Sequence, residues 1–305
     1  MNIKDFLKEN IDIGGWVEAL VDWILVNLQP VLDGISDVIG FLSNGFGDIL
    51  RGAPPELMAV ILVALAWWRV SWRFGIFAAI SMLVLFSMGL WAETMSTLAL
   101  VLSASVVALV LGLPVGVAMA RSDKVEASVR PLLDLMQTMP PFVYLIPAAI
   151  FFGLGKVPGT LATVIFAMPP AVRLTNLGIR QVSQEHVEAG QAFGCTPRQL
   201  LFKIQLPLAA PSIMQGINQT IMLALSMVVI ASMIGAGGLG ATVLTGIQRL
   251  QVGLGFEGGL AVVFLAILLD RISQSFGQRR RGQGSGWGLL QWFFRGRQAG
   301  DKSAA

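Results

Sequence analysis

The sequence predicts an all-α integral membrane protein with about seven transmembrane helices, preceded by an amphipathic helical region. Three observations support this fold class. Hydrophobic residues make up 55% of the 305 residues and charged residues only 13%, whereas soluble domains carry about 25% charged residues. The mean hydropathy is +0.72. Apolar stretches close to the ~20 residues that cross a bilayer as a helix recur along most of the chain.

Residues 1–55 form the first unit, an amphipathic region that we expect outside the cytoplasm. Apolar residues recur three and four positions apart between Trp16 and Leu50, and acidic residues fall between them. This spacing predicts one helical stripe, or two helices broken near Pro30. Such a region either lies flat on the membrane or packs against the rest of the protein, and the sequence leaves both alternatives open.

Residues 56–275 form the second unit, a transmembrane domain. The candidate spans are 57–72, 74–91, 96–120, 131–153, 159–178, 213–234 and 258–272. The first and the last are short, so they depend on packing and on flanking anchors. Pro140, Pro141 and Pro147 are expected to break the fourth span and to free backbone carbonyl groups.

The distribution of Lys and Arg predicts the orientation, because basic residues concentrate in cytoplasmic segments. With the N-terminus outside, the inner segments hold most of the basic residues, and the outer loops between spans hold only Lys156 and Arg249. The C-terminus is then cytoplasmic, and residues 276–305 form a flexible basic tail there. The segment 183–211 also faces the cytoplasm.

This segment is a polar interruption between two apolar spans, and its pattern predicts two helices joined by a turn. Ser183 is the expected N-cap of the first helix, and Gly194 is expected to end it in the left-handed conformation. The stretch TPRQ at 196–199 begins a second helix with a capping box and a proline at its first position. Pro207 and Pro211 are expected to end that helix. By periodicity alone, the segment equally suits a helix resting at the membrane interface.

The spacing within this segment resembles the EAA loop of ABC importer permeases, which reads EAA, three residues, G, nine residues and I-x-L-P. The corresponding residues are Glu188, Ala189, Gly190, Gly194, Ile204, Leu206 and Pro207, with Gly190 in place of the second Ala. In that family, the loop docks in a cleft of a separate ATP-binding subunit. The resemblance therefore implies that these residues, together with Pro197 and Arg198, couple the chain to such a subunit.

Two further stretches extend the resemblance. RPLLDLMQTMPPFVYLIPAAIFFGLGKVPG at 130–159 and INQTIMLALSMVVIASMIGAGGLG at 217–240 are similar to the permease subunit of the glycine betaine/proline (and choline) uptake systems used in osmoprotection. The likeness implies a homodimeric permease in the bacterial inner membrane, two cytoplasmic ATPases that bind ATP-Mg, and an external substrate-binding protein. The implied function is ATP-driven import of such compatible solutes by alternating access. The alternative is a permease for another small amino acid or quaternary amine.

The composition gives little support to catalysis or metal binding. Cys195 and His186 are the only residues of their types, and the phosphate-binding sequence G-x-x-x-x-G-K-[ST] is absent. We therefore expect no enzymatic activity, no metal or cofactor bound by this chain and no nucleic acid, with membrane lipid as the remaining partner. An ion-coupled secondary transporter is the main rival of another class, but its candidate groups Asp134 and Asp270 lie near the ends of spans.

A translocation path needs polar or adaptable groups inside the membrane. The candidates are Gln137, Thr138, Met139, Phe142, Tyr144, Asn218, Gln219 and Ser226. The simpler role for each polar member is a hydrogen bond between helices, worth about 0.6–2 kcal/mol. The Trp residues cluster near span ends and in the flanking regions, as in an aromatic belt. We therefore expect no aromatic cage for a quaternary ammonium group in this chain, and expect the external protein to select the solute.

Overall fold

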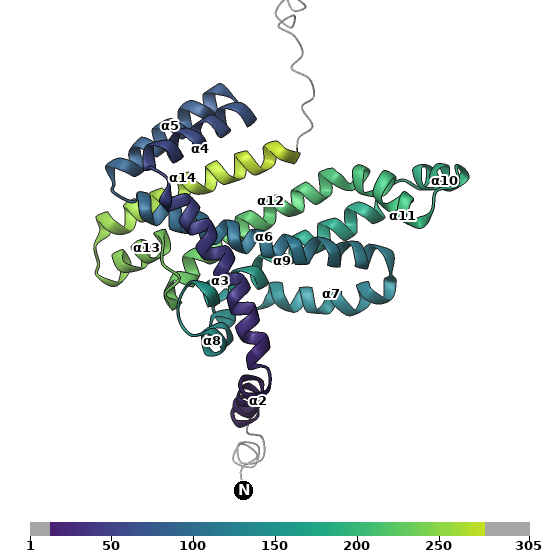
Figure 1. Ribbon diagram of the computed structural model, residues 1–305, viewed down its shortest axis with the longest axis horizontal. Helices are drawn as coiled ribbons and strands as arrows, with labels where there is room; N and C mark the ends of the chain where they lie inside the picture. The colour runs from purple at the N-terminus through teal and green to yellow at the C-terminus, as the bar shows by residue number, and fades with distance from the viewer. Residues whose placement is uncertain (1–12, 278–305) are drawn as a thin grey trace, which may run out of the picture.

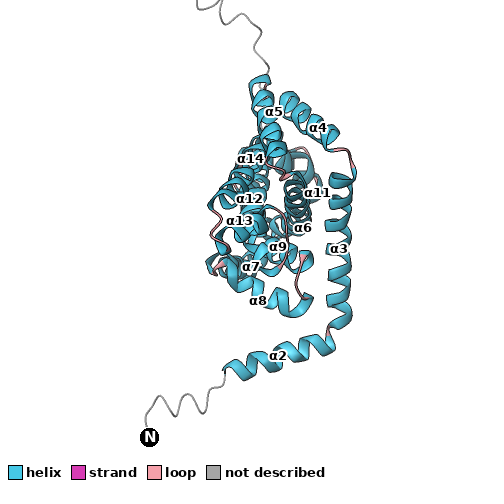
Figure 2. Ribbon diagram, turned by 90° about the vertical axis from the view of Figure 1, so that its left-hand side faces the viewer, coloured by secondary structure: helices cyan, strands magenta, loops and turns pink. Residues whose placement is uncertain are grey.

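The computed structural model describes residues 13–277, and every regular element within them is a helix (Figures 1 and 2). In chain order the elements are α2 Ile13–Asn27, α3 Gln29–Gly52, α4 Pro55–Arg69, α5 Trp72–Ser87, α6 Trp91–Arg121, α7 Asp123–Thr138, α8 Pro141–Phe152, α9 Lys156–Arg180, α10 Gln184–Ala192, α11 Pro197–Leu200, the π-helix η1 Leu201–Gln205, α12 Leu206–Ala231, the 3₁₀-helix η2 Ser232–Ile234, α13 Leu239–Gln248 and α14 Val252–Gly277. The predicted tail 276–305 lies almost wholly outside the described residues.

Four helices are long and apolar enough to cross a membrane: α6, α9, the continuous run Pro197–Ile234 and α14. They correspond to the spans predicted at 96–120, 159–178, 213–234 and 258–272. Two bent pairs, α2 with α3 and α7 with α8, bring the number to six if each pair is one span. By length and composition, the described residues therefore support four to six spans, fewer than the seven that the sequence predicts.

The difference lies in the first two predicted spans, 57–72 and 74–91. They form α4 and α5, which contain 15 and 16 residues and pack together as a helical hairpin. At 1.5 Å per residue, each helix is roughly 22–24 Å long, which is less than the ~30 Å thickness of the hydrocarbon core. Gly75 allows the close contact, because a Cβ atom at this position would lie 2.9 Å from the Cβ of Trp67.

The fourth predicted span is broken, as its prolines suggest. The axes of α7 and α8 differ by 101°, and Met139 between them is extended, as expected for a residue that precedes proline. The break falls at Pro140 and Pro141, whereas Pro147 lies within α8 without ending it. The hydroxyl of Tyr144 donates a hydrogen bond across the break to the carbonyl oxygen of Met136, which fixes the bend.

The centre of the fold is α9, which packs between α6 and α12. Small residues allow these helices to approach closely, as in many membrane proteins. A Cβ atom on Gly116 of α6 would lie 2.6 Å from the carbonyl oxygen of Val172, and one on Gly178 of α9 would lie 2.7 Å from the Cβ of Ser212. Larger side chains at these crossings would push the helices apart.

The N-terminal region consists of two helices that meet at an angle of 76° next to Pro30, so the prediction of a break there is confirmed. Of the two alternatives for this region, α3 shows packing against the protein: it crosses the outside of the bundle and contacts α6 and α9 (Figure 2). Ile39 and Leu50 of α3 are buried, while Asp33 and Asp48 are exposed.

Candidate functional site

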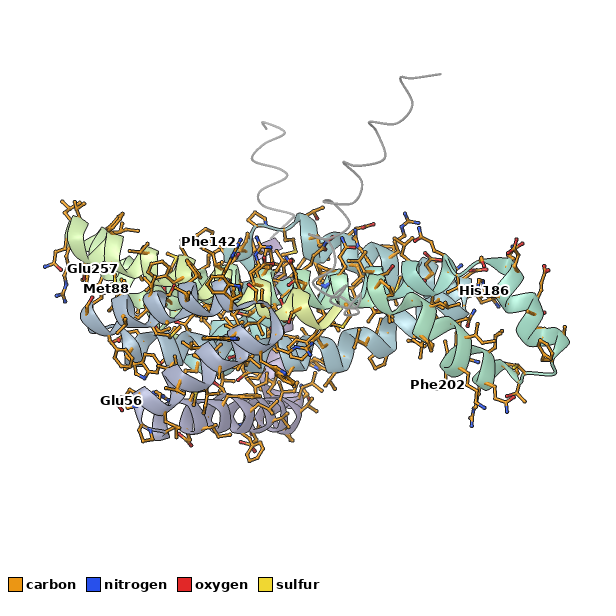
Figure 3. The ribbon with its side chains drawn as sticks, turned by 90° about the horizontal axis from the view of Figure 1, so that it is seen from above. Glu56, Met88, Phe142, His186, Phe202 and Glu257 are labelled. Carbon is orange, nitrogen blue, oxygen red and sulfur yellow. The ribbon has the colours of Figure 1, made fainter. Side chains whose placement is uncertain are left out.

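The segment 183–211 forms an elbow that projects from the bundle. The helices α10 and α11 lie at one extreme of the long axis of the molecule (Figure 1). His186 and Phe202 mark this extreme, and Glu257 and Met88 lie toward the opposite one (Figure 3). The elbow joins α9 to α12 and is therefore held by the two central helices of the fold.

The local geometry of the elbow follows the sequence pattern. Gly194 has φ = +74°, the left-handed conformation that ends α10. Thr196 and Gln199 form a capping box at the start of α11: the Gln199 backbone N–H donates to Thr196 Oγ1 at 3.3 Å, and the Thr196 N–H donates to Gln199 Oε1 at 2.9 Å. Ser183 occupies the N-cap position of α10, but its hydroxyl pairs with His186 Nδ1 instead of capping the backbone.

The expected end of the second helix at Pro207 and Pro211 is wrong. The chain continues from α11 through η1 into α12 as one helical run. The π-helix explains how this is possible, because the Leu206 N–H bonds the carbonyl oxygen of Leu201, five residues back. This register change comes just before Pro207, which has no N–H to offer an ordinary α-helical turn.

The structure assigns Gly190 a contact within the chain. It is buried, and a Cβ atom there would lie 2.5 Å from Cδ1 of Ile204 and 2.9 Å from Cδ1 of Leu200. Leu206 packs beside Ile179 in a small core at the base of the elbow. These residues therefore set the angle between α10 and the following helix, whereas the sequence pattern placed Gly190 and Ile204 only in a docking motif.

The surface of the elbow is formed by other residues. Glu188, Ala189, Pro197, Arg198 and Pro207 are all exposed. Glu188 and Arg198 have no ion-pair partner in the described part of the chain. Two aromatic side chains that the motif does not include are also exposed, Phe193 by 89% and Phe202 by 66%. Exposed phenyl rings on an otherwise polar projection are typical of a protein interface.

Arg180, the last residue of α9, anchors the base of the elbow. Its Nη2 lies 2.7 Å from Asp123 Oδ1, 3.0 Å from Glu126 Oε2 and 2.8 Å from the carbonyl oxygen of Met119. Its Nε donates to Asn176 Oδ1 at 3.0 Å. One guanidinium group thereby joins the ends of α6, α7 and α9 immediately before the chain enters the elbow.

The predicted path residues fall into separate groups. Gln137 and Thr138 are exposed on α7, and Phe142 is exposed on the side of the bundle between its two ends (Figure 3). Tyr144 faces inward and is only 7% exposed; its hydroxyl is bound as described above. The group on α7 and α8 also includes the half-buried Met139. Its α7 members pack against α6 and α9, whereas α8 packs against α9 and also contacts α12.

The α12 group lines a polar groove. Asn218 and Gln219 face a cavity of about 360 Å³ between α12 and the end of α14. Sequence reasoning missed its other polar residues, Gln215 and Gln274. A signal was available for Gln215, because polar residues recur on one helical face of α12 at 215, 219 and 226. Ser226 lies farther along this face and donates to the carbonyl oxygen of Met222 at 3.1 Å.

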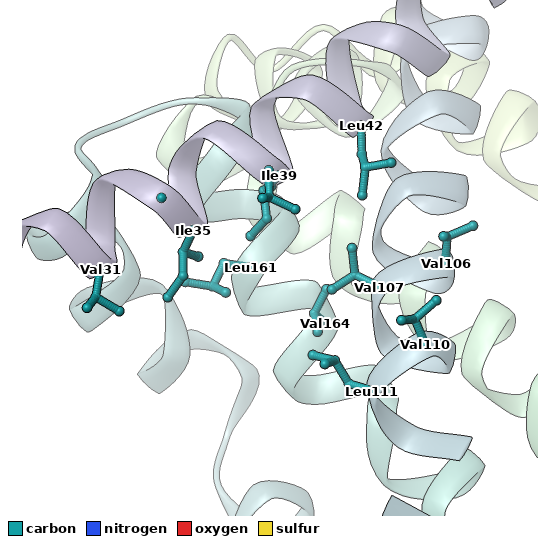
Figure 4. A pocket seen from close by; sticks show the side chains of 12 residues that line it. Val31, Ile35, Ile39, Leu42, Val106, Val107, Val110, Leu111, Leu161 and Val164 are labelled. Atoms are coloured by element: carbon teal, nitrogen blue, oxygen red, sulfur yellow. The ribbon is translucent and has the colours of Figure 1, made fainter. Parts of the chain in front are cut away.

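A second cavity, of about 510 Å³, is a cleft between α3, α6 and α9 (Figure 4). Its lining consists of aliphatic side chains and one glycine: Val31, Gly34, Ile35, Val38, Ile39, Leu42, Val106, Val107, Val110, Leu111, Leu161 and Val164. A lining without polar side chains offers a charged solute no hydrogen bonds. The polar groove is therefore the better candidate for contact with a polar solute.

Comparison with known proteins agrees with this architecture. The model of the family described as "Binding-protein-dependent transport system inner membrane component" matches residues 108–282. The chain is 47% identical to the glycine betaine/proline betaine transport system permease protein ProW of Escherichia coli (strain K12), over 93% of this chain and 80% of that protein. It is 48% identical to the glycine betaine/carnitine transport permease protein GbuB of Listeria monocytogenes, over 90% of this chain and 98% of the other.

Solved structures give the same fold at lower identity. A structure titled as an inward-facing conformation of the MetNI methionine ABC transporter superposes with a TM-score of 0.55 at 23% identity, covering 62% of this chain and 96% of that one. A second crystal form gives 0.52. The long apolar helices, the projecting elbow and these matches lead to one conclusion: the chain is a multi-pass inner-membrane protein that belongs to the binding-protein-dependent transport system inner membrane components, the permease subunits of ABC importers.

Proposed function

We propose that this permease imports glycine betaine and related compatible solutes, a class that includes proline betaine, proline and choline. The observation that carries the proposal is the 46–49% identity, over at least 90% of the chain, to permeases named for glycine betaine transport. Relatives named for trimethylamine N-oxide are 34–35% identical, and a choline transport permease of Bacillus subtilis is 33% identical over 55% of the chain. The gradient of identity favours a betaine as the preferred solute.

As a binding-protein-dependent ABC permease, the chain works with an ATP-binding subunit and a substrate-binding protein. The finer assembly is part of the proposal: two copies of this chain form the membrane channel, each copy receives one ATPase carrying ATP-Mg, and the binding protein docks on the outer side. The N-terminus lies outside and the C-terminus in the cytoplasm, which places the elbow on the ATPase side.

The chemistry of the elbow supports this arrangement. Phe193 and Phe202 supply apolar surface for a cleft in the ATPase, and Glu188 and Arg198 supply charges without partners in the described chain. Gly194 sets the turn that presents these side chains. When ATP binding moves the ATPases, the elbow carries the movement to α9 and α12, and the path alternates between outward and inward access. This chain itself performs no catalysis; it transmits the ATPase cycle.

Reconstitution tests the proposal directly. The permease is combined in proteoliposomes with its ATPase and binding protein, and uptake of radiolabelled glycine betaine, proline, choline and carnitine is measured with ATP or a non-hydrolysable analogue inside. We expect ATP-dependent accumulation of glycine betaine above the other solutes. Accumulation driven by an ion gradient without ATP, or ATP-driven uptake of none of these solutes, would contradict the proposal.

A further inference from the structure

The polar groove is built from one face of α12 and the end of α14. On α12 its residues are Pro211, Met214, Gln215, Asn218 and Gln219, which recur at the three- and four-residue spacing of a single helical face. Gln274 and Gly277 of α14 complete it. Because Pro211 lies close to the elbow in sequence and Gly277 ends α14, the groove opens at the elbow end of these helices.

A carboxylate stands behind the groove. Asp270 Oδ1 accepts hydrogen bonds from Asn218 Nδ2 at 3.2 Å and from Gln274 Nε2 at 2.7 Å. Ser273 donates its hydroxyl to the side-chain oxygen of Asn218. Asp270 therefore orients two of the amides that line the groove. Because the Gln274 amide nitrogen donates to Asp270, the carbonyl oxygen of the same side chain is available to the groove.

The other two amides are free to bind a solute. Within residues 13–277, no hydrogen-bond partner exists for the side chains of Gln215 and Gln219, and both residues are exposed. Exposed amides beside a carboxylate are costly when they face hydrocarbon, because their hydrogen bonds remain unmade. In a membrane protein, such a face lines a water-filled space or a protein interface.

Resting on the proposed function, we propose that this groove is the site from which the solute is released to the cytoplasm, and that it recognises a quaternary ammonium group joined to a carboxylate. The Gln215 and Gln219 amide N–H groups donate to the carboxylate of the solute. The carbonyl oxygen of Gln274, reinforced by the negative charge of Asp270, attracts the ammonium group, and Met214 and Pro211 contact its methyl groups. Asp270 is a positioning residue, since it acts through the amides it holds.

Two features of the groove suit release. Neutral amides make fewer and weaker contacts than an arginine fork or an aromatic cage. A betaine has no hydrogen-bond donor: its carboxylate accepts hydrogen bonds and its ammonium group attracts oxygen atoms. The groove offers N–H donors and a carbonyl oxygen at separate places, so it can contact both ends of the solute. We therefore expect a dissociation constant of about 1 mM or weaker, which permits rapid departure.

The test uses the permease with its ATPase subunits in nanodiscs, without the binding protein. Saturation-transfer NMR measures binding of three probes: glycine betaine, tetramethylammonium, which has no carboxylate, and acetate, which has no cation. Gln215→Leu and Gln219→Leu should each weaken glycine betaine binding about fivefold, equivalent to about 1 kcal/mol, without affecting tetramethylammonium. Asp270→Asn should weaken glycine betaine and tetramethylammonium but not acetate. Asn44→Leu, an exposed amide on α3, is the matched control and should change nothing.

The alternative is that Asn218, Asp270 and Ser273 only join α12 to α14. In that case Asp270→Asn alters assembly or thermal stability, while the two Gln variants bind glycine betaine as the unaltered complex does, and the inference is overturned. Equal binding of all three probes by every variant overturns it as well. Uptake in the complete reconstituted system separates the two levels. If the complete system accumulates glycine betaine and the groove variants behave normally, only the groove assignment fails; if it accumulates none, the proposed function fails.

Discussion

Among the residues of the elbow, Gly194 has the clearest structural role, because its backbone conformation forms the turn. Its φ of +74° is reached at little cost only by glycine and, less readily, by asparagine. Beyond Gly194 and its two chain neighbours, no heavy atom lies within 4 Å of the place where its Cβ would be, so a substitution there is opposed by backbone strain and not by crowding. Its effect therefore reports on the turn alone.

This separation allows a matched pair of variants. Gly194→Val should strain the elbow by about 1–2 kcal/mol or more and lower ATP-driven uptake at least tenfold, while membrane insertion stays normal. Gly194→Asn keeps the left-handed turn and should retain most of the uptake. Proteoliposome uptake and co-purification of the ATPase are the measurements. Equal uptake by both variants would show that the turn at Gly194 does not position the docking surface.

The residue scale also shows how far the sequence could be interpreted. Gly194 and the Thr196–Gln199 capping box were predictable because a turn or a helix cap depends on only four or five consecutive residues. The burial of Gly190 was not, since its neighbours Leu200 and Ile204 reach it only through the fold. The exposure of Phe193 was likewise hidden, because an aromatic residue in a helix is more often buried than presented.

At the scale of elements, proline had opposite outcomes in two helices. Pro140 and Pro141 break α7 from α8, as expected, because consecutive prolines remove two donors and constrain Met139. Pro207 and Pro211 do not break the run from α11 to α12, because η1 shifts the hydrogen-bond register first. Hydrophobic period and proline positions cannot distinguish these cases, whereas the backbone register in the structure does.

The contacts between α7 and α9 give a prediction at this scale. Arg180→Met removes the bonds to Asp123, Glu126 and Met119 and should cost about 1–2 kcal/mol. We expect ATP hydrolysis to continue while solute uptake per ATP falls severalfold. The reason is that a movement of α9 is then no longer passed to α6 and α7 through the Arg180 contacts. Parallel assays of phosphate release and uptake measure this ratio.

Arg173→Met is the control for that variant. It removes the ion pair to Asp134, which joins the same two helices, but both side chains there are well exposed. Such pairs contribute little, so uptake per ATP should stay close to normal. If uptake per ATP fell equally in the two variants, the coupling would depend on ion pairs between α7 and α9 in general and not on the contacts of Arg180 in particular.

For the whole molecule, composition and the order of apolar stretches predicted the class and the four spans that form long, continuous helices in the structure. They also marked α4 and α5 as spans, although the turn between these two helices comes after only 15 residues, because hydropathy detects apolar residues without recording where a helix ends. The N-terminal region was ambiguous for a related reason: an amphipathic stripe fits a membrane surface and a protein surface equally well.

Orientation is the prediction that belongs to this scale. In a Cys195→Ser background, single cysteines replace Gln29 at the α2–α3 bend, Gln251 before α14 and Gln191 on the elbow, all exposed positions. A membrane-impermeant maleimide added to intact spheroplasts should label the first two and reach the third only after permeabilisation. Labelling of Gln191→Cys in intact spheroplasts would reverse the topology and remove the elbow from the ATPase side.

The unbroken run Pro197–Ile234 has one more consequence. In our proposals Arg198 docks on the ATPase, and Gln215 and Gln219 line the groove. All three lie on this one helical run, and between Arg198 and Gln215 the run contains the π turn, Pro207 and Pro211. If this run moves as one body, a rotation at the elbow also turns the groove residues. The movement of the ATPase and the opening of the groove are then coupled through one helix, so the release of the solute follows the nucleotide state of the ATPase.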